Sequence, residues 1–394
     1  MRVINGDCIE QMRTLQDNSI DAILTDPPYE LGFMGKKWDK SGIAYNVEMW
    51  KECLRVLKPG GYLLSFGGTR TYHRMACAIE DAGFEIRDML EFIFASGFPK
   101  SQNIGKMYDK KMGNEREVLK IRVDGNKGGG VKTFDDDNYV WDKPFNETKG
   151  TSPYEGLGTA TKPAHEPIVC ARKPLSEKTV VDNVMKWGTG GIEIDECRIP
   201  TARIEPHKTW RTSPSRDGAN QYSSFQVGSF GEQSPLGRFP ANVLCQDNAL
   251  NDKGGESRYF DIDIWNQKYG LLQFPKASKR ERNRGLEGFE EIEVRGGGRV
   301  ANGYDLTDKS QIRLKEATGK YGAVKTKKAN THPTVKPLAL MRYLVTLVSR
   351  RGQIVLDPFA GSGTTLVACK ELGRDYIGIE LEEEYIPIIK ARLR

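Results

Sequence analysis

Apolar and polar residues alternate along the first part of this chain with periods that change between strand and helix. The short apolar stretches AILTD, YLLSF and EIRDMLEFIFA are typical of buried strands. Residues 46–61 end at Pro-Gly-Gly and place five apolar side chains on one helical face: Met49, Trp50, Cys53, Leu54 and Leu57. A second helix is expected over residues 70–81, before Gly83. The alternation predicts a parallel sheet with helical crossovers over residues 1–100.

The same alternation returns after residue 331. We expect a helix for KPLALMRYLVTLVSRRG, a buried strand for QIVLD, a helix for GTTLVACKELG, a strand for DYIGIEL and a closing helix for EEEYIPIIKARL. Neither end has enough strands to cover its own helices, so the two pieces are expected to be halves of one sheet. The predicted fold class is α/β.

Residues 101–330 have a different character. They are rich in Gly, Ser, Asn, Lys and Arg, with loop-like patches such as DGNKGGGVKTFDDDN and VRGGGRVANGYD. Two ordered islands interrupt the first part: HEPIVCARK is expected to be a strand, and SEKTVVDNVMKWG a capped helix that ends at Gly188. We therefore interpret residues 101–199 as an insertion with a strand and a helix that return to the sheet, and residues 200–330 as a separate irregular region.

Composition excludes several classes of protein. A chain of 394 residues with 38% apolar residues can fill one large or two ordinary domains. No run approaches the roughly 20 apolar residues that span a bilayer, and MRVINGDCIE does not resemble a secretory signal, so we expect a cytoplasmic protein without a membrane partner. The seven cysteines are scattered and form no C-x-x-C pair, which argues against disulfides or a metal site. The net charge of +6 permits nucleic acid binding without demanding it.

A glycine-rich turn follows the strand IVLD. Gly361, Ser362 and Gly363 open the next helix, and such a turn lets backbone N–H groups approach a ligand. The following strand ends at Glu380, about 20 residues on, where nucleotide-binding α/β units place an acid for ribose hydroxyls. The turn lacks the third glycine of a dinucleotide site and the lysine of a phosphate loop. A nucleoside without a pyrophosphate fits, as S-adenosylmethionine does; a turn that serves only helix packing is the alternative.

Another distinctive stretch is an elbow after the strand AILTD, formed by Asp26, Pro27, Pro28 and Tyr29. With HPTVKP at residues 332–337 and LDPFAGSGTT at residues 356–365, in that order, this DPPY stretch resembles the motifs of the amino-group DNA methyltransferases of the β class. The resemblance covers roughly residues 1–100 and 331–394. ASGFPKSQNIGK, AHEPIVCARKPLSEKTVVDNVMKWGTGG and FPKASKRERNRGLEG are similar to stretches of phage or prophage members.

The resemblance implies an S-adenosylmethionine-dependent methyltransferase sheet of the Rossmann-like kind, with an irregular DNA target-recognition region inserted at residues 200–330. The catalytic half would be residues 1–100 and the cofactor-binding half residues 331–394. The expected partner is double-stranded DNA with the target base flipped out. A base amine is a poor nucleophile because its lone pair is delocalised, so the Asp26 carboxylate and the Pro27 carbonyl would each accept one of its hydrogens. Pro28 would keep the elbow extended and Tyr29 would stack on the base.

Family roles carry over to the positions that match the motifs. Asp7, with Cys8 and Ile9 beside it, matches the acid that contacts the cofactor adenine, although a plain surface turn is the alternative. Thr334 and Lys336 match the motif expected near the methionine carboxylate. The other expected cofactor residues are Asp357, Phe359, Gly361, Gly363, Thr364, Thr365 and Glu380. The basic run expected at DNA phosphates comprises Lys276, Lys279, Arg280, Arg282 and Arg284.

Several alternatives stay open. In the family, Asp before Pro-Pro-Tyr goes with adenine N6 and Ser with cytosine N4, so Asp26 favours adenine and leaves cytosine N4 as the alternative. A cytosine C5 enzyme is disfavoured because the sequence has no Pro-Cys pair, and an RNA or protein-glutamine methyltransferase because its cofactor motif precedes the elbow. An inactive DNA-binding homologue is the third rival. A homodimer and a cognate restriction enzyme are compatible with the sequence, which specifies neither; no metal is expected.

Overall fold

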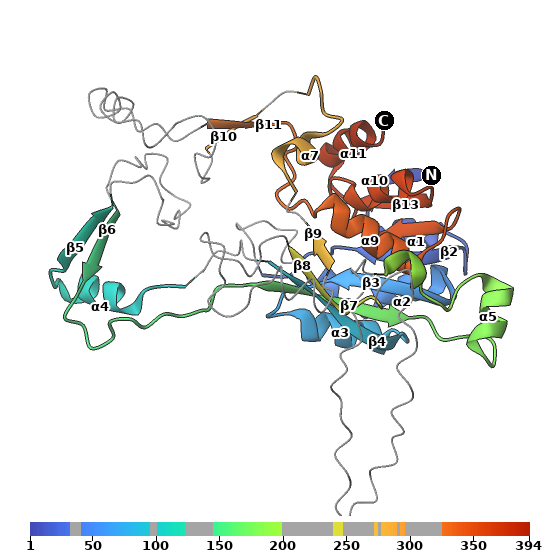
Figure 1. Ribbon diagram of the computed structural model, residues 1–394, viewed down its shortest axis with the longest axis horizontal. Coiled ribbons are helices and arrows are strands. Elements are labelled where there is room, and N and C mark those ends of the chain that lie inside the picture. Colours follow the sequence, from blue (N-terminus) through green and yellow to red (C-terminus); the bar gives the residue numbers. More distant parts are fainter. Residues whose placement is uncertain are drawn as a thin grey trace, which may run out of the picture. The chain divides into compact units, whose positions relative to one another are not determined.

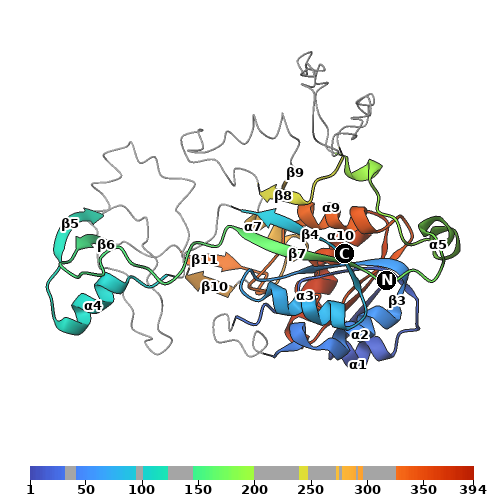
Figure 2. The same cartoon turned by 90° about the horizontal axis from the view of Figure 1, so that it is seen from below.

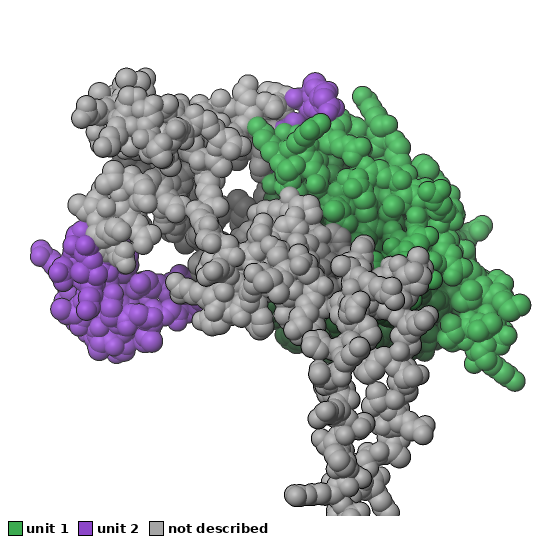
Figure 3. Space-filling model, in the orientation of Figure 1, with its two compact units in different colours: residues 1–96, 164–285, 332–394 green, residues 97–163, 286–331 purple. Residues whose placement is uncertain are grey.

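The chain divides into two compact units (Figure 3), described here from a computed structural model. Unit 1 comprises residues 1–96, 164–285 and 332–394, and unit 2 comprises residues 97–163 and 286–331. The residues that the structure describes are 1–31, 41–94, 101–122, 145–198, 239–246, 272–274, 277–289, 292–295 and 325–394. No helix within these ranges is long and apolar enough to cross a membrane.

Unit 1 is built on a nine-stranded sheet (Figure 1). In spatial order its strands are β1 (Arg2–Asn5), β13 (Asp375–Glu380), β12 (Ile354–Asp357), β2 (Ile20–Thr25), β3 (Leu57–Phe66), β7 (His165–Arg172), β4 (Glu85–Ile93), β8 (Val243–Gln246) and β9 (Leu272–Phe274). The strands β1, β13, β12, β2 and β3 run parallel, and β7 runs antiparallel to both of its neighbours, β3 and β4. The predicted α/β class with a mostly parallel sheet is confirmed.

The two ends of the chain meet in the middle of this sheet. Strand β12 pairs in parallel with β2, with Val355 opposite Ala22 and Leu356 opposite Ile23. All four residues are fully buried, as expected for strands covered by helices on both faces. The expectation that the two pieces are halves of one sheet is therefore confirmed.

Helices cover both faces of the sheet (Figure 2). Those of unit 1 are α1 (Cys8–Arg13), α2 (Val47–Val56), α3 (Tyr72–Asp81), α5 (Val180–Trp187), α7 (Lys279–Asn283), α9 (Leu338–Val348), α10 (Thr364–Glu371) and α11 (Ile386–Arg392). The apolar sides of α1, α2 and α3 form one core cluster, and those of α9, α10 and α11 form the other. Short 3-10 turns occur at Ile43–Tyr45, Asp195–Cys197 and Glu383–Tyr385.

Helix α2 is shorter than its sequence pattern predicts. It buries Met49, Trp50 and Cys53 as expected but ends at Val56, and the Pro-Gly-Gly stretch that was expected to stop it belongs to β3. Gly60 explains the difference. Its φ is +78°, and a Cβ there would lie 2.5 Å from the side-chain amide nitrogen of Asn183, so the glycine serves the close packing of β3 rather than the helix end.

The chain reverses its direction of winding between β12 and β2. After β12 it passes through α10 to β13, whereas after β2 it passes through α2 to β3 on the opposite side. Open α/β sheets bind their ligands outside the carboxyl ends of the strands at such a reversal. The DPPY elbow and the glycine-rich turn follow these two strands, so the fold brings both motifs to this edge.

Unit 2 contains elements that the sequence patterns did not predict. They are α4 (Ile104–Met112) and two antiparallel pairs, β5 (Glu117–Arg122) with β6 (Phe145–Lys149) and β10 (Ile292–Arg295) with β11 (Lys325–Lys328). Arg116, directly before β5, forms an ion pair with the fully buried carboxylate of Asp109 in α4. It forms a second ion pair with Glu155, at 2.6 Å. These charged groups come from different parts of the sequence and meet only in the folded chain, so no hydrophobic period predicts their contacts.

Most of the segment expected to read DNA lies outside the described residues. Its described parts include β8, β9 and α7 in unit 1, and β10 and β11 in unit 2. Its recognition role stays a prediction.

Candidate active site

The DPPY elbow begins where β2 ends. All six residues of β2 are buried, so Asp26 is placed at the carboxyl edge by a rigid strand. The two prolines that follow have no N–H group to continue the sheet, and the chain turns away. The Thr71 hydroxyl donates a hydrogen bond to the Tyr29 carbonyl at 2.8 Å. A Cβ at Gly68 would lie 3.3 Å from the Tyr29 side chain, so close packing also holds the elbow.

Four polar side chains meet at this elbow. The Lys336 Nζ lies 2.8 Å from Asp26 Oδ2 and 3.3 Å from Glu166 Oε2, and it donates to the Tyr29 hydroxyl oxygen at 2.9 Å. The same nitrogen lies 4.7 Å from the centre of the Phe66 ring. Because only 12% of the Lys336 side chain is exposed, its charge is balanced by these protein groups and little by water.

The protonation states of this cluster follow from its contacts. Burial acts to lower the pKa of Lys336, but the carboxylates of Asp26 and Glu166 outweigh it, and the pKa is raised. Burial and the same two carboxylates raise the pKa of Tyr29. At neutral pH, Lys336 is therefore a cation and Tyr29 a neutral phenol.

Asp26 keeps one acceptor that no described residue uses. Its Oδ2 faces Lys336, whereas its Oδ1 is buried and has no hydrogen-bond partner among the described residues. Buried polar atoms are usually paired, and an unpaired one is common where a ligand supplies the partner. This oxygen can accept a hydrogen from a bound base.

The glycine-rich turn is held by Glu380. Gly361 has a φ of +53°, and its N–H donates to Glu380 Oε2 at 2.7 Å. The N–H of Glu382 donates to Oε1 at 2.9 Å. Burial raises the pKa of Glu380 to about 7, although these two donors act in the opposite direction. A carboxylate this strongly desolvated gains from further hydrogen-bond donors on a ligand.

A buried hydrogen bond connects the elbow to the turn. The Thr25 hydroxyl, at the end of β2, donates to Asp357 Oδ1, at the end of β12, at 2.8 Å. The N–H of Phe359 donates to the same oxygen at 3.1 Å. Burial raises the pKa of Asp357 to about 6, while hydrogen bonds from Thr365 and Thr25 lower it. Asp357 and Thr365 thus have structural roles in addition to any contact with a cofactor.

A second support of the turn comes from α11 and was missed in the sequence. Arg392 donates to the carbonyl and the hydroxyl of Ser362, at 2.7 and 2.9 Å, and to the Thr364 hydroxyl at 3.2 Å. Burial lowers the pKa of Arg392 to about 10. Gly363, with a φ of +79°, directly precedes α10, and a Cβ there would lie 3.0 Å from Ile389 of α11. The closing helix therefore shapes the turn.

The other expected cofactor residues have identifiable structural roles. The Asp7 side chain accepts the N–H groups of Ile9 and Glu10, at 2.9 and 3.1 Å, and so caps α1. Cys8 is buried, which raises the pKa of its thiol to about 12, and Ile9 packs on the same core cluster. The Thr334 carbonyl accepts from His332 Nδ1 at 2.7 Å. Their contacts with a cofactor stay predictions.

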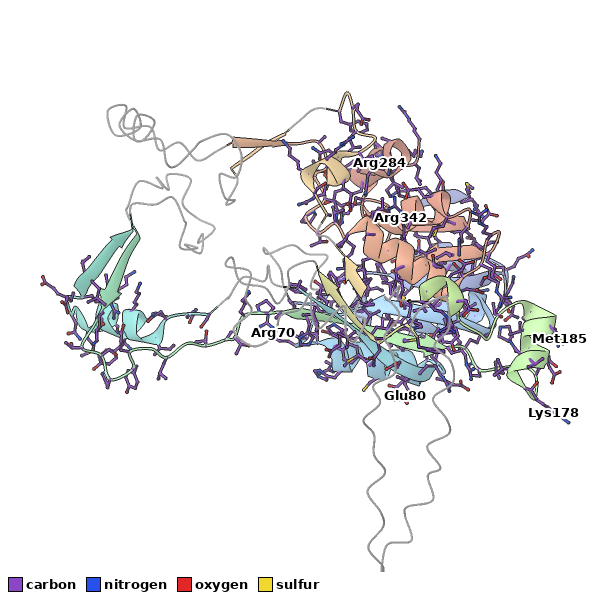
Figure 4. All side chains as sticks on the ribbon, viewed as in Figure 1. Arg70, Glu80, Lys178, Met185, Arg284 and Arg342 are labelled. Atoms are coloured by element: carbon purple, nitrogen blue, oxygen red, sulfur yellow. The ribbon has the colours of Figure 1, made fainter. Side chains whose placement is uncertain are left out.

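Part of the basic run is occupied by contacts within the protein. Arg284 pairs with Glu371 at 2.6 Å, and Arg342 of α9 donates to the same carboxylate at 2.6 Å; Figure 4 labels both arginines. Arg282 donates to the His332 carbonyl at 3.5 Å. Lys279 and Arg280 are exposed on α7, and Lys276 lies outside the described residues. Contact of this run with DNA stays a prediction.

Glu166 is the member of the elbow cluster that sequence reasoning missed. The strand HEPIVCARK was expected, but its antiparallel direction was not. Because β7 runs opposite to β3 and β4, its first residues lie at the carboxyl edge of those strands, and Glu166 pairs with Phe92. The sequence signal that could have identified Glu166 was an acidic residue at the start of the predicted strand HEPIVCARK.

Comparison with known proteins decides the family. Residues 20–391 match the family described as DNA methylase, whose name combines the N6 and N4 amino groups. The chain belongs to the DNA methylase family. Methylases of this family depend on S-adenosylmethionine and act on amino groups of DNA bases. The expected family is thereby confirmed, while the match does not choose between adenine and cytosine.

Individual DNA methylases resemble the chain to different extents. Type II methyltransferase M.HindIII of Haemophilus influenzae is 22% identical over 434 residues, which cover 99% of this chain and 94% of the relative. Type II methyltransferase M2.DpnII of Streptococcus pneumoniae is 48% identical over 65 residues, 16% of this chain and 24% of the relative. The solved M1.HpyAVI–SAM complex has 16% identity and a TM-score of 0.39, with 100% of this chain and 99% of the other covered. The solved structure of PvuII DNA methyltransferase (cytosine-N4-specific) has 12% identity and a TM-score of 0.45, with 100% of this chain and 86% of the other covered.

Proposed function

We propose that this DNA methylase transfers a methyl group from S-adenosylmethionine to the N6 amine of an adenine flipped out of double-stranded DNA. The observation that carries the proposal is the buried Oδ1 of Asp26, an acceptor with no partner among the described residues, at the sheet edge where the winding reverses. Asp26 and the Pro27 carbonyl would each accept one amine hydrogen. The nitrogen lone pair is then localised and directed at the methyl group.

The residues at the glycine-rich turn fit S-adenosylmethionine. When bound, this cofactor supplies a methyl group on a positively charged sulfur. Glu380 is a buried acceptor with a pKa of about 7, and ribose hydroxyls would supply the donors that stabilise its ionised form. Gly361 lets the backbone approach the ligand closely because it has no side chain. Phe359, Thr364 and the adenine-side residue Asp7 would complete the cofactor site.

Lys336 would lie on the base side of the site. The resemblance led us to expect it at the methionine carboxylate, but its ammonium group contacts Asp26, Glu166 and Tyr29. A flipped base would stack on the partly buried Tyr29 ring beside it, which would offset part of the few kcal/mol that flipping costs.

Adenine is favoured over cytosine by the first residue of the elbow. Asp26 stands where the cytosine N4 enzymes of the resemblance carry Ser. Both amines are conjugated to a ring and can use the same two acceptors, so cytosine N4 is the alternative. The relatives are named type II methyltransferases, which supports a place beside a restriction enzyme. A homodimer is compatible with this role.

The test is a transfer assay followed by nucleoside analysis. The purified protein is incubated with S-adenosylmethionine and genomic DNA from a methylation-deficient bacterium, and the digested nucleosides are separated by mass spectrometry. We expect N6-methyldeoxyadenosine. N4-methyldeoxycytidine alone would change the acceptor base, and absence of both products would refute methyl transfer to DNA amines.

A further inference from the structure

Two carboxylates share a single lysine at the elbow. Asp26 and Glu166 lie 2.8 and 3.3 Å from the Lys336 ammonium, and their side chains are 21% and 24% exposed. They come from different strands, Asp26 after β2 and Glu166 in β7. With both acids ionised, the three groups together carry one negative charge; without Glu166 their sum is zero.

The proposed reaction moves positive charge toward this cluster. The amine nitrogen beside Asp26 would gain the methyl group as the sulfur–carbon bond of S-adenosylmethionine breaks, and it would carry a positive charge until it releases a proton to water. Charge that develops in a transition state is stabilised by fixed opposite charge in a partly buried site. A pair of Asp26 and Lys336 alone would offer little net stabilisation, because the lysine cancels the aspartate at longer range.

We propose that Glu166 is a positioning residue for methyl transfer: it balances Lys336, so that the negative charge of Asp26 remains available to the amine. This inference rests on the proposed function. Lys336 in turn holds Asp26 Oδ2 and the Tyr29 hydroxyl, which leaves Asp26 Oδ1 for the base. Each member of the cluster thus has a separate task, and Glu166 need not touch the substrate.

Nearby titratable groups do not replace Glu166. Burial lowers the pKa of His332 to about 4, so this ring is neutral at the pH of the assay. Asp357 accepts hydrogen bonds from Thr25 and Phe359 and serves the junction of β2 and β12. Glu166 is therefore the acid whose distance to Lys336 suits the balancing role.

The test compares single-turnover rates at saturating S-adenosylmethionine on unmethylated bacterial genomic DNA. Glu166→Gln removes one charge and nearly preserves the shape, and we expect its rate to fall roughly 10- to 100-fold with unchanged cofactor affinity. Glu166→Asp keeps the charge and should retain most of the rate. Glu80→Gln, an exposed glutamate on α3 (Figure 4), is the matched control.

A double variant separates charge balance from a merely structural role. Lys336→Met removes the charge that Glu166 balances and also the contacts of Lys336 with Asp26 and Tyr29, so the comparison is made within that background. Adding Glu166→Gln to Lys336→Met should lower the rate several-fold less than Glu166→Gln lowers it in the wild-type protein, whereas a structural role independent of Lys336 would lower it equally in both backgrounds. Thermal unfolding and cofactor calorimetry on every variant exclude a folding effect.

The outcomes are distinguishable. Wild-type rate in Glu166→Gln, loss of cofactor affinity in that variant, or an equal effect of Glu166→Gln in the wild-type and Lys336→Met backgrounds would each overturn the role of Glu166 while leaving methyl transfer intact. A wild-type protein that methylates no DNA would overturn the proposed function, and the role of Glu166 with it.

Discussion

At the scale of single residues, Asp26 is the group on which the chemistry depends. Replacing it by alanine removes one of the two preorganised acceptors, and we expect methyl transfer to fall on the order of 100-fold or more. Cofactor affinity should persist, because Glu380 and the glycine-rich turn remain. Asp81→Ala, at the exposed end of α3, is the control. Undiminished transfer by Asp26→Ala in the transfer assay with nucleoside analysis would show that the amine is activated elsewhere.

The raised pKa of Glu380 predicts a proton released on cofactor binding. Since that pKa is about 7, about half of the molecules carry the proton at pH 7. Hydrogen bonds from ribose hydroxyls favour the ionised form, so binding lowers the pKa, releases protons and is weaker at pH 6 than at pH 8.

Calorimetry in two buffers measures this release directly. At pH 7 the observed binding enthalpy should differ between phosphate and Tris, which have different ionisation enthalpies. Glu380→Gln has no proton to release, so it should bind more weakly and lose the difference. Equal binding enthalpies in the two buffers for the wild-type protein would show that Glu380 does not contact the cofactor.

At the scale of elements, the shape of the glycine-rich turn depends on the side chains that pack against it. Gly361 has a φ of +53°, and a Cβ there would lie 2.9 Å from the His332 ring, whereas Gly373 has a φ of +69° and open space around it. Alanine at either position should destabilise the fold by about 1–2 kcal/mol because of the left-handed backbone. Only Gly361→Ala should also lose cofactor affinity, because its methyl group displaces the ring.

The comparison of the two glycine variants separates backbone strain from a crowded turn. Thermal unfolding reports the first effect and calorimetry with S-adenosylmethionine the second. If Gly361→Ala bound the cofactor as tightly as Gly373→Ala, the turn would not be part of the cofactor site.

At the scale of the whole molecule, recognition is predicted to reside in residues 200–330. This segment separates the two motif-bearing pieces, and its loop-rich, basic composition suits contacts to DNA phosphates and bases. Exchanging it for the corresponding segment of another DNA methylase should transfer that enzyme's target site, as single-molecule sequencing of DNA from expressing cells would report. If the exchanged protein still methylated its original target site, specificity would reside in residues 1–100 and this prediction would be wrong.

The sequence by itself determined the features that depend on neighbouring residues. Continuous apolar runs predicted β2 and β12, and helical spacing predicted α2 and α9. The order of DPPY, HPTVKP and the glycine-rich turn indicated the family. These signals are local because strand and helix periods, and the shape of a turn, involve only a few consecutive residues.

Only the tertiary structure decided which distant groups meet at the elbow. Tyr29 and Lys336 are 307 residues apart in sequence and hydrogen-bonded in space, and Glu166 joins them because β7 enters the sheet antiparallel. Neither the strand order nor the direction of β7 is encoded in a local period, since an apolar strand reads the same in both directions. The charge balance of the elbow cluster therefore arises from packing, because β2, β7 and the segment before α9 bring one cation and two carboxylates together.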